Sequence, residues 1–82
     1  MAQHQVLSPL PGIFYRRPSP EQPPYKEDGD RVAEGDVVGL IEVMKQFTTL
    51  RAGVAGIVRE VYAKDGELVE FAQPLFLIDT HG

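Results

Sequence analysis

Apolar residues occur along the chain in short runs, separated by glycine, proline and acidic residues, with almost no helical periodicity. The runs are rich in Val, Ile, Phe and Tyr, and seven prolines and eight glycines interrupt the 82 residues. Short β-branched and aromatic segments bounded by turn-forming residues are typical of an all-β sandwich or barrel. The pattern predicts eight strands, near residues 5–7, 13–16, 31–33, 37–43, 47–51, 56–63, 68–70 and 75–79.

An internal repeat divides the chain into two halves. Residues 28–41 align without a gap with residues 65–78, at an offset of 37. Earlier in each half, residues 12–14 align with residues 56–58, at an offset of 44. Two similar four-stranded halves that share one core predict a flattened barrel-sandwich with pseudo-twofold symmetry, and a single domain over residues 1–82.

The two offsets differ by seven residues, so the first half carries an insertion that the second half lacks. The insertion falls within residues 16–27, RRPSPEQPPYKE, a segment that holds four of the seven prolines. Because the second half closes without these residues, we expect the insertion to project from one half as a loop that the core does not need.

The segment VVGLIEVMKQFTTL, residues 37–50, has strand character over fourteen residues without Pro, Asn or Asp. Strands are usually 3–10 residues long, so a turn is expected within it. Tight hairpins favour Asn-Gly or Asp-Gly, because both turn residues need positive φ. The symmetrical position for the turn is Met44-Lys45, at a strain of about 1–3 kcal/mol. Such a departure from local preference often marks a functional site, so Lys45 and Met44 are the candidate functional residues.

The composition favours a non-catalytic carrier or binding module over an enzyme. The net charge of −4 disfavours nucleic acid or an anionic membrane as partner, and no apolar run approaches the ~18 residues of a membrane span. The absence of cysteine excludes disulfides and a thiolate nucleophile and fits a reducing cytoplasm. The two histidines, His4 and His81, lie near opposite chain ends and predict neither a metal site nor a catalytic relay.

The residues at the expected hairpin turn resemble a known family. The run Glu42-Val43-Met44-Lys45 is similar to the Glu-Ala-Met-Lys-Met biotinylation motif of biotin carboxyl carrier proteins. Val43 stands where the family usually has Ala, and Gln46 stands where it usually has a second Met. The Met-Lys half of the motif is therefore intact.

The resemblance extends over nearly the whole chain, from Leu7 to Asp79. Residues 8–16, SPLPGIFYR, resemble the opening strand pair of the family. Residues 69–71, VEF, and residues 74–75, PL, resemble its closing segment. Residues 18–20, Pro-Ser-Pro, resemble the start of the protruding "thumb" in the carrier subunit of bacterial acetyl-CoA carboxylase. The thumb of that family coincides with the insertion in the first half.

The resemblance implies a carrier with the biotinyl/lipoyl fold that catalyses no reaction itself. A biotin protein ligase would activate biotin as an acyl adenylate and join it to Lys45, beside Met44, through an amide bond. The biotin would then act as a swinging arm, taking a carboxyl group from biotin carboxylase to a carboxyltransferase. The thumb favours acetyl-CoA carboxylase, and hence cytoplasmic fatty acid synthesis, as the setting.

Two other functions fit the same fold class. A lipoyl carrier usually has Asp before the modified lysine and Ala or Val after it, so Met44 and Gln46 both favour biotin. An unmodified barrel-sandwich interaction module does not need a Met-Lys pair at its hairpin turn, and usually sits between helical segments that this sequence lacks.

Overall fold

The structure is a computed structural model that describes residues 2–80 and consists of eight strands. Within these residues no helix is long and apolar enough to cross a membrane. The predicted all-β architecture is confirmed. The strands are β1 (Gln3–Leu7), β2 (Gly12–Tyr15), β3 (Arg31–Val32), β4 (Val37–Val43), β5 (Gln46–Arg51), β6 (Gly56–Val61), β7 (Glu67–Val69) and β8 (Pro74–Asp79).

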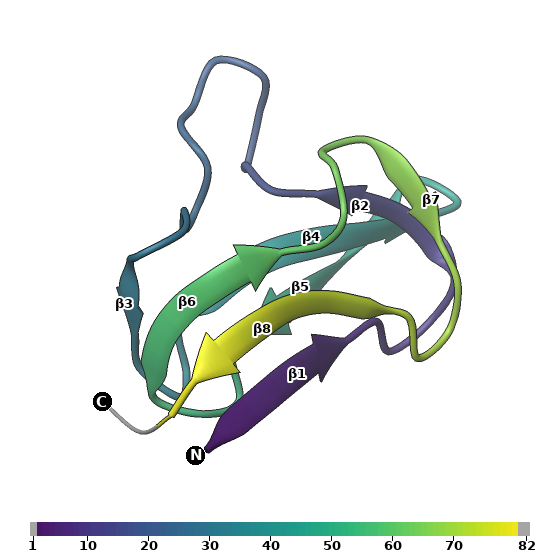
Figure 1. Ribbon diagram of the computed structural model, residues 1–82. Coiled ribbons are helices and arrows are strands. Elements are labelled where there is room, and N and C mark those ends of the chain that lie inside the picture. The colour runs from purple at the N-terminus through teal and green to yellow at the C-terminus, as the bar shows by residue number, and fades with distance from the viewer. Residues whose placement is uncertain (1, 81–82) are drawn as a thin grey trace.

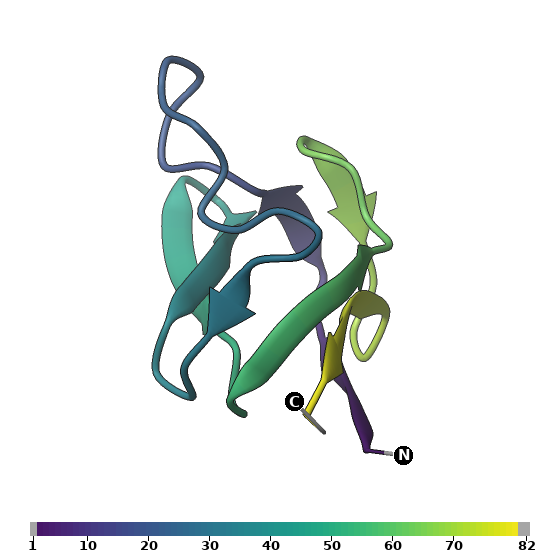
Figure 2. The same ribbon diagram turned by 60° about the vertical axis from the view of Figure 1, so that its left-hand side comes forward.

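The strands form two antiparallel four-stranded sheets that face each other, as Figures 1 and 2 show. One sheet has the strand order β1-β8-β6-β3, and the other has the order β5-β4-β2-β7. Replacing each strand by the one four places along the chain converts the first order into the second. The predicted pseudo-twofold symmetry is therefore present, and each half gives two strands to each sheet.

The sequence repeat is also a repeat of turn chemistry. The Asp30 carboxylate accepts a hydrogen bond of 2.8 Å from the backbone N–H of Glu27. At the equivalent place in the second half, the Glu67 carboxylate accepts one of 2.9 Å from the backbone N–H of Lys64. Side-chain acceptors that bond to nearby backbone N–H groups stabilise such turns. The acidic residues after each Asp-Gly pair thus fix the same bend twice.

The core lies between the sheets and is built from apolar side chains of both halves. The Phe14 and Phe76 rings meet edge to face, with centroids 5.7 Å apart. In the repeat, Val58 is the residue equivalent to Phe14, and Gly39 is the residue equivalent to Phe76. Each large ring in one half therefore corresponds to a smaller residue in the other half. A Cβ on Gly39 would lie 2.7 Å from the Phe14 ring. The buried apolar residues are Val6, Phe14, Val32, Val38, Ile41, Leu50, Ala52, Val58, Ala63, Val69, Leu75, Phe76 and Ile78.

Two equivalent glycines let neighbouring strands approach closely. A Cβ on Gly12, at the start of β2, would lie 2.6 Å from the backbone oxygen of Glu42 and 2.9 Å from Val43. Gly56, at the start of β6, makes the equivalent approach to the backbone of Asp79. Gly12 therefore fixes the distance between β2 and the end of β4.

Several strand bounds differ by one or two residues from the sequence-based expectation, and the ends of β2 and β6 have a visible cause. β2 ends at Tyr15, because the backbone N–H of Arg16 donates to the Asp65 carboxylate at 2.7 Å and leaves the ladder. β6 ends at Val61 instead of residue 63, after an irregularity in its pairing with β8 between Val58 and Glu60. The chain then turns through an Asp-Gly pair into β7.

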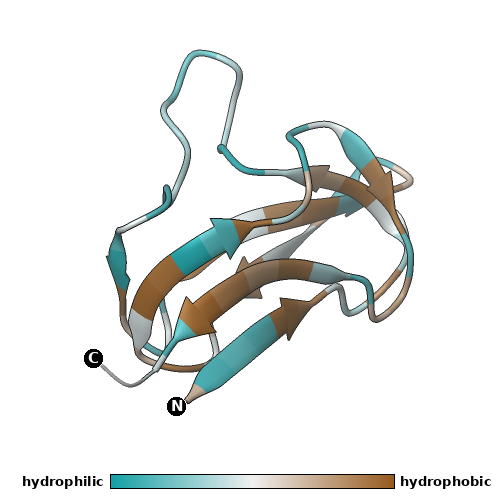
Figure 3. Cartoon of the chain, viewed as in Figure 1, coloured by the Kyte–Doolittle hydropathy of each residue, from teal (hydrophilic) through white to brown (hydrophobic). Residues whose placement is uncertain are grey.

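The segment between β2 and β3 projects from the body of the molecule (Figure 1), and we call residues 16–27 the projecting loop. The corresponding connection between β6 and β7 is short. Figure 3 shows apolar residues concentrated on the strands, whereas the projecting loop is mainly hydrophilic or neutral. The loop thus breaks the symmetry of the two halves.

The close approach at Gly12 predicts a large difference between two glycine substitutions. Gly12→Ala should lower the free energy of unfolding by about 1–3 kcal/mol, because the new methyl group meets backbone that cannot move aside. A Cβ on Gly35 meets nothing within 4 Å, so Gly35→Ala is the control and should stay within about 0.5 kcal/mol of wild type. Thermal unfolding measures both variants, because each kcal/mol of lost stability lowers the Tm of a domain of this size by about 4–8 °C. Equal effects of the two substitutions would contradict the packing described.

Candidate functional site

The hairpin between β4 and β5 turns through Met44 and Lys45. The last paired residues are Val43 and Gln46, so the turn has two residues. Met44 has φ of 51° and Lys45 has φ of 68°. Positive φ at both central residues is the mark of a type I′ turn, which normally selects Asn and Gly. The turn lies where the sequence predicts it, and both residues adopt a conformation unfavourable for their side chains.

Both side chains of the turn are open to solvent. Met44 is 90% exposed, although methionine is usually a core residue. Lys45 is exposed, and no hydrogen bond or ion pair joins its side chain to any of residues 2–80. The hairpin therefore presents a primary amine that no other described group competes for.

The turn lies at the opposite end of the molecule from the two chain ends (Figure 1). The repeat makes Val43 and Gln46 equivalent to Thr80 and Ala2, whose backbones are joined by a hydrogen bond of 2.9 Å. The hairpin thus occupies the place that, in the other half, holds the two termini. The turn therefore has no counterpart under the symmetry, because its equivalent place is taken by the two ends of the chain.

The strand that leads to the turn is held on both sides. β4 pairs with β2 through Ile13–Glu42 and with β5 through Glu42–Phe47. Ile41, next to Glu42, is fully buried and fixes the strand against the core. The turn is therefore presented by an inner strand of a sheet, and its position does not depend on a flexible loop.

A polar and aromatic contact supports the hairpin on the outer face of this sheet. The Tyr15 hydroxyl donates a hydrogen bond of 2.8 Å to the Glu42 carboxylate. The Tyr15 and Phe47 rings lie 6.1 Å apart, tilted by 51°. Sequence reasoning missed Tyr15 and Phe47. Counting outward from the turn would have paired Phe47 with Glu42, but Tyr15 depends on the register of β2.

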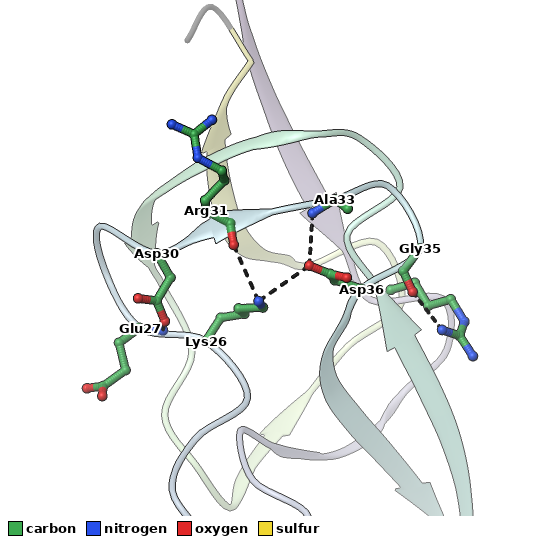
Figure 4. A network of polar contacts seen from close by, with 8 residues as sticks. Lys26, Glu27, Asp30, Arg31, Ala33, Gly35 and Asp36 are labelled. Atoms are coloured by element: carbon green, nitrogen blue, oxygen red, sulfur yellow. Dashed lines mark hydrogen bonds and ion pairs between the residues drawn. The ribbon is translucent and has the colours of Figure 1, made fainter.

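The projecting loop is closed at its neck by backbone and side-chain hydrogen bonds. The Tyr25 N–H donates to the Arg16 backbone oxygen at 2.8 Å, and the Arg16 guanidinium donates to the Lys26 backbone oxygen at 3.1 Å. The Lys26 amine lies 3.3 Å from the Asp36 carboxylate (Figure 4). The hydrogen bond from the Ala33 backbone N–H is the largest cause that lowers the pKa of Asp36, and the contact with Lys26 lowers that pKa further. Lys26 thus ties the loop to the turn before β4.

A cavity of about 280 Å³ lies between the projecting loop and the outer face of the sheet. Its walls are loop residues 17–20 and, outside the loop, Tyr15, Leu40, Phe47 and Asp65. Phe47 is two residues from Lys45 in sequence. The cavity therefore begins beside the hairpin.

The described residues contain no group of three or more His, Cys, Asp or Glu side chains that could hold a metal ion. His4 is exposed on β1, and His81 lies outside the described residues.

Comparison with known proteins assigns the family. Residues 4–78 match the family described as "Biotin-requiring enzyme". The chain belongs to this family. Biotin is therefore the cofactor of the domain, and the unpaired amine on the exposed turn fits a group attached through an amide bond.

Related proteins of known description agree with this assignment. The chain is 40% identical over 79 residues to the "Biotin carboxyl carrier protein of acetyl-CoA carboxylase" of Haemophilus influenzae, covering 96% of this chain and 51% of the relative. It is 45% identical over 73 residues to the protein of the same description from Chlamydia muridarum, covering 89% and 45%. The chain thus spans about half the length of these relatives.

The fold recurs within a much larger protein of known structure. The crystal structure of the Kluyveromyces lactis urea carboxylase matches with a TM-score of 0.77 and 26% sequence identity. The match covers 96% of this chain and 6% of the urea carboxylase chain. The biotin-requiring domain described here therefore resembles a small part of that carboxylase.

The strain in the turn predicts that a conventional turn sequence stabilises the fold. Met44→Asn/Lys45→Gly should raise the free energy of unfolding by about 1 kcal/mol, because Asn and Gly tolerate positive φ. Met44→Ala/Lys45→Ala removes the same side chains without that relief and should leave stability near wild type. Denaturant unfolding compares the three proteins. An Asn-Gly variant no more stable than the Ala-Ala variant would show that the turn is unstrained.

Proposed function

We propose that this domain is a biotin carboxyl carrier in which biotin is attached to Lys45. The observation that carries the proposal is the unpaired amine of Lys45 on a strained, exposed turn, in a chain of the biotin-requiring family. Of the other two lysines, Lys26 is ion-paired with Asp36 and Lys64 lies in the connection between β6 and β7, far from the hairpin in sequence. Met44 precedes Lys45 and provides an exposed thioether that the modifying ligase contacts.

Attachment requires little of the domain beyond presentation. The Lys45 amine loses a proton and attacks the acyl carbon of biotinyl adenylate, which a biotin protein ligase makes from biotin and ATP. The new C–N bond is an amide, and AMP leaves with the electron pair of the broken C–O bond. Amide formation removes the positive charge of Lys45, so the formal net charge of −4 becomes more negative by one.

The domain then works as a carrier in a biotin-dependent carboxylase. Biotin, when attached, supplies a ureido nitrogen that can accept and release a carboxyl group. The names of the relatives favour acetyl-CoA carboxylase as the setting. We propose biotin carboxylase and a carboxyltransferase as the partners of the domain, and the cytoplasm as its location. The chain itself is non-catalytic, and its inner strand β4 holds the turn in one position. Tethering to the domain raises the effective concentration of biotin at each partner enzyme.

The projecting loop is the thumb in this proposal. Its neck is closed by its own hydrogen bonds, and the equivalent connection in the second half closes the same core without an insertion. The loop therefore contributes to the surface beside the hairpin, through the cavity it forms with Phe47 and Leu40, and little to the core.

Substitution of the lysine tests the assignment directly. Lys45→Arg should abolish biotin incorporation, because a guanidinium does not undergo acylation by the ligase, and should leave thermal unfolding unchanged. Lys64→Arg makes the same change at another exposed lysine and should be biotinylated like wild type. Intact mass after incubation with biotin, ATP and a biotin protein ligase measures all three proteins. Incorporation into Lys45→Arg, or its loss in Lys64→Arg, would place the attachment elsewhere.

A further inference from the structure

Four residues form a row across the outer face of the sheet that carries the hairpin. The printed registers join Phe47 to Glu42, Glu42 to Ile13, and Ile13 to Leu68, from β5 across to β7. Phe47 is 58% exposed and Leu68 is 65% exposed. The row is therefore an apolar strip at the surface with a single carboxylate inside it, and we call it the hairpin row.

The pseudo-twofold symmetry provides an internal comparison. The other sheet has the equivalent row, in which Gln3 pairs with Asp79, Asp79 with Ile57, and Ile57 with Arg31. The inner pair is the same in kind, an acidic residue beside isoleucine. The outer positions are polar, with Gln3 in place of Phe47 and Arg31 in place of Leu68. The fold thus tolerates polar residues at both ends of this row, and stability alone does not require apolar ones.

The acidic residues of the two rows are held by different partners. Asp79 pairs with the guanidinium of Arg59, at 2.7 Å and 3.0 Å. The residue equivalent to Arg59 is Tyr15, and its hydroxyl donates to Glu42 at 2.8 Å. Both contacts orient the acidic side chain across equivalent pairs of strands, β2 and β4 in one sheet and β6 and β8 in the other, but only Arg59 neutralises the charge of its partner.

Tyr15, unlike Arg59, brings no positive charge to its acidic partner. None of the ion pairs among residues 2–80 involves Glu42. The hydrogen bond to Glu42, together with desolvation and the nearby Glu42 and Asp65 charges, raises the pKa of Tyr15. Tyr15 thus remains a neutral donor at physiological pH. The result is an oriented, uncompensated carboxylate framed by apolar side chains, three residues before Lys45.

We propose that the hairpin row docks a cationic side chain of biotin carboxylase, and that Tyr15 is the positioning residue that holds Glu42 for this contact. The inference rests on the proposed carrier function. Biotin carboxylase binds ATP and bicarbonate, which are both anions, so we expect basic side chains around its active site, and these would complement the Glu42 carboxylate. Acylation of Lys45 removes the positive charge that lies nearest to Glu42 in the sequence.

The test compares charge changes at equivalent places on the two sheets. Glu42→Gln removes the charge and keeps the shape, and Tyr15→Arg copies the neutralised Arg59–Asp79 arrangement. Glu60→Gln makes the same change in net charge on the exposed part of β6, in the other sheet, and is the matched control. Each 82-residue protein is first biotinylated and checked by intact mass, and then used as the substrate of purified biotin carboxylase with ATP and bicarbonate.

We expect Glu42→Gln and Tyr15→Arg to raise KM for the biotinylated domain about threefold to tenfold, with kcat within about twofold of wild type. Increasing salt should raise KM for wild type and for Glu60→Gln, and should have a smaller effect on the other two variants. If Tyr15→Arg does not fold, Glu42→Gln decides alone. A KM for Glu42→Gln equal to that of Glu60→Gln would overturn the docking contact, whereas wild-type protein that carries no biotin would overturn the carrier function beneath it.

Discussion

Each half of the chain gives two strands to each sheet, and this interleaving is the constraint on which the rest of the structure depends. Neither half can complete a sheet by itself, so both must close around one core. Phe14 and Phe76 meet at its centre, one from each half. The arrangement places β4 between β2 and β5, and Gly12 sets how near β2 comes. The hairpin after β4 therefore has a fixed position. The free energy gained by packing the sheet offsets the unfavourable free energy of positive φ at the turn.

The features that matter for function lie where the two halves differ. The hairpin turn stands where the other half has the chain ends, and the projecting loop has no counterpart between β6 and β7. A phenol takes the place of a guanidinium beside an acidic residue, so Glu42 accepts a neutral hydrogen bond where Asp79 forms an ion pair. The strands and core that the two halves share provide stability. The departures from symmetry provide the exposed amine, the cavity and the hairpin row.

The sequence predicts much of this frame for identifiable physical reasons. Short apolar runs between turn residues indicate all eight strands, and the repeat indicates their symmetry. The strand-like residues on either side of Met44-Lys45, in a stretch without Pro, Asn or Asp, locate the hairpin turn. Strand ends are less predictable, because β2 ends where Arg16 bonds to Asp65, a residue 49 positions away. The contact of Tyr15 with Glu42 likewise spans 27 positions and depends on the register of β2 against β4, which only the packed sheets fix.

The choice between biotin and lipoate tests the central claim most directly, because both groups are attached to hairpin lysines of this fold. The wild-type chain can be incubated with a biotin protein ligase and a lipoate-protein ligase together, each with its substrates, and examined by intact mass. Met44 and Gln46 flank Lys45 in place of the Asp and Ala or Val that a lipoyl site usually has, so the account predicts one biotinyl group per chain and no lipoyl group. A chain that takes up mainly lipoate, or neither group, would contradict it.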